Sequence, residues 1–422
     1  MIIDQVRDDA LRGREIAYGS LYLNRRRRGF GRRLGFGRCQ KEQHGQVAIC
    51  SLIGIMRGHY MMWRGLAPLL LLAPLCATEP PVRLAIAGLN HGHVSGFLRT
   101  ALLRTADVQV VGVWDPDSAL LARYAKDNKL ATGMLYTDLA GMLDAVKPEA
   151  VATFTDTYAH AAVVEACAPR HITVMMEKPL AVNVKQAHAI EQSAAKYGVS
   201  VFVNYETTWY RSHGAIWDLI HEQKAAGEIR KMVAMDGHEG PKEIHVQPEF
   251  LAWLTDPVKN GAGALFDFGC YGANLMTWML DNQRPLKVTA LAQTNKPAIY
   301  ARVDDEATVL LEYPKAQGII QGSWNWPYSR KDFEVYGEKG YAIATGGNGL
   351  RVRLDRANAE ETRTPTERKP EEPDSISYLV AVARGKFKPY GLNSLENNVV
   401  VVEILDAARE SIRTGRTVTL TR

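Results

Sequence analysis

Residues 82–93 read VRLAIAGLNHGH, and this stretch decides the fold class. Its first six residues form a short apolar run, which is typical of a buried β-strand, and Gly88 then ends the run at a turn. A helical pattern follows over residues 94–104, and a second apolar run, VQVVGVW, occupies residues 108–114. The order of strand, glycine turn, helix and strand indicates a βαβ unit with parallel strands.

The same alternation continues for the next 90 residues or so of the chain. Further helices are predicted over residues 119–129, 159–168 and 184–197, and further strands over residues 150–154, 172–176 and 200–203. Short continuous apolar runs are typical of strands that are covered on both faces. The sequence therefore predicts an α/β fold that begins with a Rossmann-type, doubly wound parallel sheet.

The first turn, GLNHGH, is expected to bind a pyrophosphate. In the dinucleotide fingerprint G-x-G-x-x-G, the glycines allow a tight turn and a close approach of phosphate to a helix N-terminus. Gly88 fills the first position, Asn90 the second and His93 the third, with His91 between them and Gly92 displaced by one. Because the match is incomplete, an ordinary strand-to-helix turn stays open as the alternative.

Asp115 ends the second strand, 27 residues after Gly88. A carboxylate at this position accepts hydrogen bonds from ribose hydroxyls and repels a 2′-phosphate, so we expect NAD rather than NADP as the cofactor. The alternative interpretation of Asp115 is a cap of the helix that follows Pro116.

Length and composition set wider limits. With 422 residues, of which 46% are hydrophobic and 23% charged, the chain has room for two domains and is not a disordered, collagen-like or disulfide-scaffold protein. The net charge of +5 is unevenly placed, because residues 1–77 hold 13 basic and 5 acidic residues. Residues 78–422 therefore hold 38 basic and 41 acidic residues, and we expect no nucleic-acid partner.

The first 77 residues are expected to lie outside the folded protein. Residues 1–55 are rich in arginine and glycine and are interpreted as a non-native or disordered extension. Residues 56–77 are interpreted as a signal peptide, with an apolar run over residues 66–75 and cleavage after Ala77. Because about 20 apolar residues are needed to cross a bilayer, the run over residues 66–75 is too short, and no stable membrane span is expected after cleavage. The signal peptide predicts that the protein is periplasmic or extracellular.

A signal peptide behind 55 polar residues indicates that translation begins later, at Met56, Met61 or Met62. The alternative is a twin-arginine signal whose apolar core is residues 47–56. If these residues are removed, Cys167 and Cys270 are the cysteines that remain, and both are expected to be buried free thiols.

A more specific signal is MMEKPLA at residues 175–181. A strand that ends in Glu-Lys-Pro resembles the glucose-fructose oxidoreductase, inositol dehydrogenase and rhizopine-catabolism (Gfo/Idh/MocA) family. Three other segments agree with this resemblance: ATF with a following His160, GAGALFDFGCYGAN at residues 261–274, and VYGEKG at residues 335–340.

This resemblance implies two domains. Residues 78–204 would be the Rossmann NAD-binding domain, and residues 205–422 an α+β substrate and dimerisation domain with a large, open, mostly antiparallel sheet. It also implies a carbohydrate as the small-molecule substrate and a homodimer or higher homo-oligomer.

The resemblance also implies the catalytic residues. Oxidation of a sugar hydroxyl needs a group that takes the hydroxyl proton and a group that steadies the developing charge. By resemblance Lys178 has the first role, with a pKa lowered by burial or by nearby positive charge. Tyr271 would be the acid/base that the Lys178 ammonium makes useful near neutral pH, on the same helical face as Asp267. A packed core aromatic is the alternative for Tyr271.

The chain departs from the common pattern of the family, which has histidine in place of Tyr271 and aspartate in place of Asn274. A histidine–aspartate relay is therefore not carried over. The further cofactor-binding residues are expected to be His91, His160 and Glu177, and the further substrate-binding residues Asn204, Trp209 and His238. No metal is expected, because the His238–Glu239 pair lacks the spacing of a zinc site.

The predicted function is an exported, NAD-dependent oxidoreductase that transfers hydride between a sugar or polyol hydroxyl and a tightly held nicotinamide. Tight binding is expected because free NAD is scarce outside the cytoplasm. One alternative is an NAD-dependent glycoside hydrolase or lyase that oxidises its sugar transiently. A second alternative is a sugar-binding protein without activity, against which the intact Lys178 and Tyr271 argue.

Overall fold

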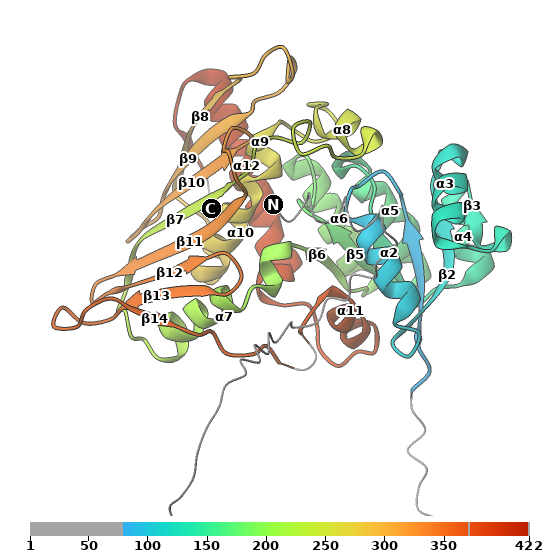
Figure 1. The fold of residues 1–422 in the computed structure, drawn as a ribbon, viewed down its shortest axis with the longest axis horizontal. Coiled ribbons are helices and arrows are strands. Elements are labelled where there is room, and N and C mark those ends of the chain that lie inside the picture. The colour runs from blue at the N-terminus through green and yellow to red at the C-terminus, as the bar shows by residue number, and fades with distance from the viewer. Residues whose placement is uncertain (1–78, 370–371, 421–422) are drawn as a thin grey trace, which may run out of the picture. The chain divides into compact units, whose positions relative to one another are not determined.

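A six-stranded parallel sheet forms the first part of the computed structural model, which describes residues 79–369 and 372–420. The predicted extension and signal peptide lie outside these residues. Strand order in the sheet is β3-β2-β1-β4-β5-β6, the doubly wound order of a Rossmann fold (Figure 1). Its strands are β1 (Val82–Ala87), β2 (Val108–Trp114), β3 (Leu135–Tyr136), β4 (Ala150–Thr153), β5 (Thr173–Glu177) and β6 (Val201–Asn204).

Helices cover both faces of this sheet, so its strands consist mainly of buried apolar residues. One buried cluster joins β1 to α2 and α3, and a second joins the other face to α4, α5 and α6. These helices are α2 (Val94–Leu103), α3 (Ser118–Asn128), α4 (Leu139–Val146), α5 (His160–Cys167) and α6 (Val184–Tyr197). The first residues of three helices are fixed by side-chain caps, since Asp117, Asp138 and Asn183 accept hydrogen bonds from the first turns of α3, α4 and α6.

The face that carries α2 and α3 is completed from the far end of the chain. Helix α11 (Ser375–Ala383) places Ile376, Leu379 and Val382 in the same buried cluster as β1. The sequence contains no local signal for this return, because α11 follows about 170 residues that belong to the other sheet. The nucleotide-binding layer is therefore built from two separate parts of the chain.

A nine-stranded sheet of order β14-β13-β12-β11-β7-β10-β9-β8-β15 forms the second layer. All neighbours pair antiparallel except β7 and β10, which run parallel. The predicted fold class, a Rossmann sheet followed by a large and mostly antiparallel sheet, is confirmed. The strands are β7 (Ile229–Gly237), β8 (Lys287–Gln293), β9 (Glu306–Glu312), β10 (Gln317–Ser323), β11 (Arg330–Gly337), β12 (Tyr341–Thr345), β13 (Gly349–Arg353), β14 (Glu361–Arg363) and β15 (Val418–Thr419).

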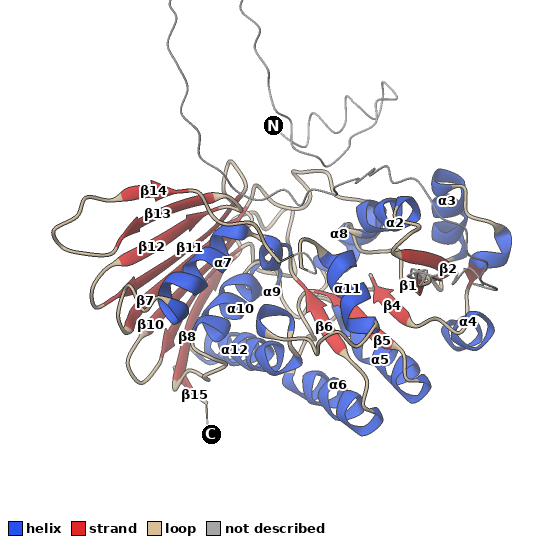
Figure 2. Cartoon of the chain, turned by 90° about the horizontal axis from the view of Figure 1, so that it is seen from below, coloured by secondary structure: helices blue, strands red, loops and turns tan. Residues whose placement is uncertain are grey.

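Most of the described helices of this second part lie on one face of the nine-stranded sheet (Figure 2). These are α7 (Arg211–Trp217), α9 (Ala264–Asp267), α10 (Gly269–Met279) and the long C-terminal α12 (Leu395–Thr414), whereas α8 (Pro248–Leu254) lies apart from them. Helix α12 contacts α10, β8 and also α6, so it joins the two layers.

Cys167 and Cys270 are both buried and free, as predicted. Burial raises the pKa of each thiol to about 12, so neither is a ready nucleophile. Among the described helices, none combines the length and the apolar character that a membrane crossing requires.

Candidate active site

Lys178 lies at the carboxyl edge of the parallel sheet, immediately after β5. The peptide bond between Lys178 and Pro179 is cis. The Lys178 ammonium donates hydrogen bonds to the Asp267 carboxylate at 2.5 Å and to the Asp267 backbone carbonyl at 2.9 Å. Asp267 is the last residue of α9, so this pair joins the two layers. Both side chains are only 7% exposed.

The charges of this pair hold each other in place. Burial alone would lower the pKa of Lys178, but the Asp267 carboxylate outweighs it, and the pKa is raised. Burial alone would raise the pKa of Asp267, but the Lys178 ammonium brings it down to about 2. The predicted lowered pKa of Lys178 is therefore wrong for the protein without its cofactor, because the prediction did not include Asp267 as a direct partner.

Tyr271 lies in the first turn of α10 with its ring below the Lys178 ammonium, 5.1 Å from it. Burial raises its pKa well above 10, with the Glu206 carboxylate adding to the effect. The expectation that Lys178 makes this phenol acidic is thus wrong, and Tyr271 is a proton donor at neutral pH. Asp267 and Tyr271 do not share one helix either, since α9 ends at Asp267 and α10 begins at Gly269.

A second lysine faces the same ring. The Lys331 ammonium, from β11, lies 4.8 Å from the centre of the Tyr271 ring and forms an ion pair with Glu206. Glu206 also accepts a hydrogen bond from the Tyr210 hydroxyl at 2.6 Å. Burial, the largest single effect, would raise the pKa of Glu206. The Lys331 charge and the hydrogen bonds to Glu206 together outweigh burial and lower this pKa to about 2. The sequence analysis did not identify Lys331 or Glu206.

Asp236 is a third residue that the sequence analysis missed. It is one residue from the end of β7, pairs in register with Lys331 on β11, and is 1% exposed. Neither of its carboxyl oxygens has a hydrogen-bond partner among the described residues. Burial therefore raises its pKa well above the ordinary value and shifts Asp236 toward its protonated form, while the charges of Lys331 and Lys178 act against this shift.

Two aromatic side chains complete the surroundings of Asp267. The Trp324 indole donates a hydrogen bond to the second Asp267 oxygen at 2.9 Å. The ring of His238 packs edge-on against Phe268, and its Nδ1 accepts the Gly240 amide. Burial lowers the pKa of His238 to about 4, so it is neutral. The structure therefore places the predicted His238 beside the catalytic pair.

The glycine turn has the shape that a phosphate site needs. Gly88 has a φ of +90°, and a Cβ at this position would lie 2.6 Å from the Thr155 side chain, so only glycine fits. The buried side-chain oxygen of Asn90 has no partner among the described residues. The turn leads directly into the N-terminus of α2, where backbone N–H groups favour an anion. These residues fit the pyrophosphate of NAD.

Asp115 supports this turn from the end of β2. One carboxylate oxygen accepts the Leu89 amide at 2.7 Å and the other accepts the Asp117 amide at 2.8 Å. The alternative interpretation of Asp115 as a helix cap is wrong, because Asp117 caps α3. Asp115 keeps the position expected for ribose recognition.

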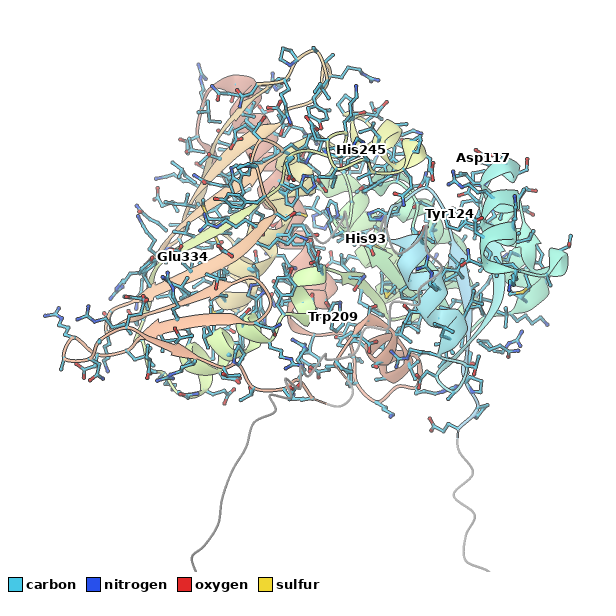
Figure 3. All side chains as sticks on the ribbon, viewed as in Figure 1. His93, Asp117, Tyr124, Trp209, His245 and Glu334 are labelled. Carbon is cyan, nitrogen blue, oxygen red and sulfur yellow. The ribbon has the colours of Figure 1, made fainter. Side chains whose placement is uncertain are left out.

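Glu177 and Asn204 connect the glycine turn to the catalytic lysine. Glu177 pairs with the His93 ring at 3.2 Å and accepts a hydrogen bond from the Asn204 amide at 3.1 Å. Burial would raise the pKa of Glu177, but its contacts with His93 and the hydrogen bond from Asn204 bring it to about 2. In Figure 3, His93 lies on the side of the nucleotide-binding layer that faces the nine-stranded sheet.

Two of the predicted site residues, His160 and Trp209, contact residues that support the site. His160 is buried and its Nδ1 lies 3.2 Å from the Leu180 carbonyl, so it supports the turn that carries Lys178. Trp209 donates to Asn204 at 3.0 Å and packs against Tyr378 of α11. The structure thus gives both residues a supporting position and does not bring Trp209 to the catalytic pair.

One group of described side chains also has the composition of a metal site. His91, His93 and Glu177 offer ligand atoms within 4.8 Å of one another. Hydrogen bonds already engage these side chains, since His91 Nδ1 accepts the His93 amide and Glu177 contacts both the His93 ring and the Asn204 amide. The absence of a metal stays a prediction that elemental analysis of the purified protein would check.

Two family descriptions match the chain. Residues 82–205 match the "Oxidoreductase family, NAD-binding Rossmann fold", and residues 213–343 match the "GFO/IDH/MocA C-terminal domain". Together they span the parallel sheet and most of the second layer, including Lys178, Asp267 and Tyr271.

Individual relatives are more distant. The chain is 26% identical to the trans-1,2-dihydrobenzene-1,2-diol dehydrogenase of Sus scrofa over 61% of this chain and 71% of that protein. The match to its Xenopus tropicalis counterpart, at 27% identity, covers 39% of this chain and 46% of that protein, so the chain spans about half the length of that relative.

Solved structures show the same fold. An inositol dehydrogenase homolog from Azotobacter vinelandii, complexed with NAD+, superposes with a TM-score of 0.69 at 19% identity, over 82% of this chain and 98% of that chain. The aldose-aldose oxidoreductase from Caulobacter crescentus, complexed with glycerol, superposes with a TM-score of 0.68 at 19% identity, over 81% of this chain and 100% of that chain.

Proposed function

Because the chain belongs to the Gfo/Idh/MocA family of NAD-binding oxidoreductases, we propose that it transfers hydride between a sugar or polyol hydroxyl and a tightly held NAD. The observation that carries the proposal is the buried Lys178–Asp267 pair above Tyr271, at the carboxyl edge of the NAD-binding sheet. The diol dehydrogenases among the relatives, and the inositol and aldose enzymes among the structures of the same fold, support a polyhydroxylated substrate.

The protonation states of the site indicate a direction. Nicotinamide, when bound, supplies the hydride donor or acceptor. Lys178 and Tyr271 both carry a proton at neutral pH, because the pKa of each lies above its ordinary value. Both can therefore donate to the oxygen of a substrate carbonyl as it becomes a hydroxyl. Oxidation of a hydroxyl requires Lys178 to lose its proton first, so oxidation is expected to accelerate as the pH rises.

Release of cofactor from the denatured protein is the first test. The purified protein is denatured and the supernatant is analysed for NAD and NADH, then the refilled protein is offered a panel of sugars and polyols with a carbonyl acceptor. NAD in the supernatant and turnover of at least one pair are the expected results. A protein that neither retains nor binds nicotinamide would contradict the proposal.

A second function, an NAD-dependent glycoside hydrolase or lyase, is favoured by Asp236. Elimination of a substituent from a transiently oxidised sugar needs an acid that protonates the leaving group. Asp236 is a buried carboxyl group without a hydrogen-bond partner among the described residues, and burial raises its pKa above the ordinary value. Chromogenic glycosides distinguish the two functions, because release of the aglycone without accumulation of NADH identifies the hydrolase or lyase.

Export is a further part of the proposal. It is supported by the signal-like residues 56–77 and by the need to retain NAD where free NAD is scarce. N-terminal sequencing of the exported protein is expected to find a mature start near residue 78. A start near residue 40 would contradict a late translation start.

We also propose a homodimer or higher homo-oligomer. Leu291 of β8 and Leu310 of β9 are 66% and 49% exposed, and they lie on strands whose far face carries none of the described helices (Figure 2). Light scattering after size exclusion is expected to show at least a dimer, and Leu291→Lys with Leu310→Glu is expected to lower the mass to that of a monomer.

A further inference from the structure

Residues 247–260, here called the strap, lie within the connection between β7 and α9. The strap contains the short helix α8 (Pro248–Leu254) and belongs to the part of the chain that builds the second layer. Figure 1 shows α8 between the nine-stranded sheet and α3, on the side of the parallel sheet where its strands end. It therefore lies beside the loops that hold a dinucleotide.

The strap contacts the glycine turn directly. The Trp253 indole donates a hydrogen bond to the Asn90 carbonyl at 3.0 Å, and the Phe250 ring packs on His91 with their centres 4.6 Å apart. A Cβ on Gly92 would lie 2.8 Å from the Phe250 ring. The glycine that is displaced from the dinucleotide fingerprint is thus explained, because position 92 must be small for the strap to close on the turn.

Two more contacts attach the strap to neighbouring loops of the same edge. Glu249 forms an ion pair with Arg123 of α3, the helix that follows β2. The amide of Tyr158, in the loop after β4, donates to the Lys259 carbonyl at 3.0 Å. The strap therefore bridges the loops after β1 and β4 and the helix after β2.

The strap also adds negative charge near Asp115. Burial is the main cause of the raised pKa of Asp115, and the Glu249 carboxylate contributes to it. Glu249 therefore lies close enough to the ribose-binding carboxylate to sense its charge.

We propose that the strap is the outer wall of the dinucleotide site and that its contacts set how slowly NAD leaves. The strap and the cofactor use the same turn, so exchange of the cofactor requires the Trp253–Asn90 and Glu249–Arg123 contacts to break. The inference rests on the NAD binding of the proposed function and not on the identity of the substrate. It gives a physical basis for an oxidoreductase that keeps its cofactor between two half-reactions.

The test measures the dissociation rate of NADH from the full-length protein. NADH fluorescence is followed after a large excess of NAD+ is added. Trp253→Phe keeps an aromatic ring but removes the hydrogen bond, and we expect dissociation about fivefold faster. Trp278→Phe, a half-buried indole of α10 outside the strap, is the matched control and is expected to leave the rate unchanged.

Glu249→Gln tests the ion pair independently on a partly exposed side chain. We expect dissociation about twofold to fivefold faster at low salt, because exposed pairs contribute modestly. In the wild-type protein the rate is expected to rise with salt, and this dependence should be lost in the variant. Glu312→Gln, which breaks the exposed pair with Lys287 on β8 and β9, is the matched control.

The possible outcomes distinguish failure of the strap proposal from failure of the NAD binding on which it rests. NADH that binds normally but leaves at an unchanged rate from both variants would overturn the strap proposal alone. A wild-type protein that binds no NADH would overturn it together with the NAD binding on which it rests. If Trp253→Phe does not fold, as judged by its thermal melt, the salt dependence of Glu249→Gln decides the question.

Discussion

Two lysine–carboxylate pairs lie close to one tyrosine ring. Lys178 pairs with Asp267, Lys331 pairs with Glu206, and the two ammonium groups lie 5.1 and 4.8 Å from the centre of the Tyr271 ring. The first pair is buried, with 7% exposure for both side chains, whereas in the second Lys331 is 19% and Glu206 47% exposed.

This difference in burial distinguishes the pair that we propose to be catalytic from a pair that we expect to have a supporting role. A buried charge that loses its partner cannot be solvated by water instead. The protonation of Lys178 and that of Asp267 therefore depend on each other. An exposed pair is screened, and water replaces either partner at little cost. Equivalent substitutions are therefore expected to change activity and stability strongly at the Lys178–Asp267 pair and weakly at the Lys331–Glu206 pair.

Replacement of the buried lysine is expected to have the largest effect. Lys178→Ala removes the proton donor of the site, and we expect kcat to fall about 10³-fold, within the range of general acid/base groups. Steady-state kinetics with the best sugar of the panel measures it. Lys331→Ala is the matched control, and an equal loss in both variants would break the distinction between the two pairs.

Tyr271→Phe removes the phenol that both ammonium groups face. We expect kcat to fall about 10²-fold while NADH binding is retained, because the ring still fills its buried position. A titration of NADH fluorescence checks binding. Turnover near that of the wild type would show that Tyr271 is a core aromatic, the alternative that the sequence left open.

Asp267→Asn tests the coupling of charge in the buried pair. Without the carboxylate, burial is left to act on Lys178, so its pKa should fall and the acidic limb of the oxidation rate should move to lower pH. The free energy of unfolding should fall by about 3 kcal/mol or more, as for other broken buried pairs. An unmoved pH profile would refute the role of Asp267 in setting the protonation of Lys178.

The same pair predicts acid sensitivity. The pKa of Asp267 is about 2 in the folded protein and near 4 in an unfolded chain, so its stabilisation is complete above about pH 4 and is lost as the pH falls toward 2. Thermal melts over this range are expected to show the loss in the wild type. In Asp267→Asn the dependence should be weaker.

Glu206→Gln is expected to have the smallest effect. The exposed pair contributes about 0.2–1 kcal/mol to stability, and kcat should change less than about threefold. Chemical denaturation and kinetics measure both values. A loss as large as that of Asp267→Asn would show that the second pair belongs to the catalytic machinery.

The comparison also shows which residues the sequence could reveal. Lys178 and Asp267 lie in contiguous motifs, EKP and DFGCY, and their elements are set by local patterns of apolar residues and turns. Lys331 and Asp236 lie on β11 and β7, and they meet only because those strands pair with Lys331 opposite Asp236. The register between two strands that are distant in the sequence cannot be predicted from the sequence of either strand alone.

A local signal for the missed residues was nevertheless present. Lys331 precedes Phe333 and Val335 in the inward phase of β11, and Asp236 follows Ala234 in the inward phase of β7. A charged residue in the apolar phase of a strand is costly unless it has a function or a partner. The sequence could not predict how deeply Asp267, the partner that sets the pKa of Lys178, is buried. Its burial depends on how α9 and α10 pack against the nine-stranded sheet.

The return of α11 to the parallel sheet has a consequence for the order of folding. The cluster around β1 includes Ile376, Leu379 and Val382, so the first domain made by the ribosome cannot complete its core until nearly the whole chain has been synthesised. Nascent chains that stop before residue 375 would expose an apolar sheet face to chaperones. Late completion of this core would delay folding, which is compatible with the export proposed above.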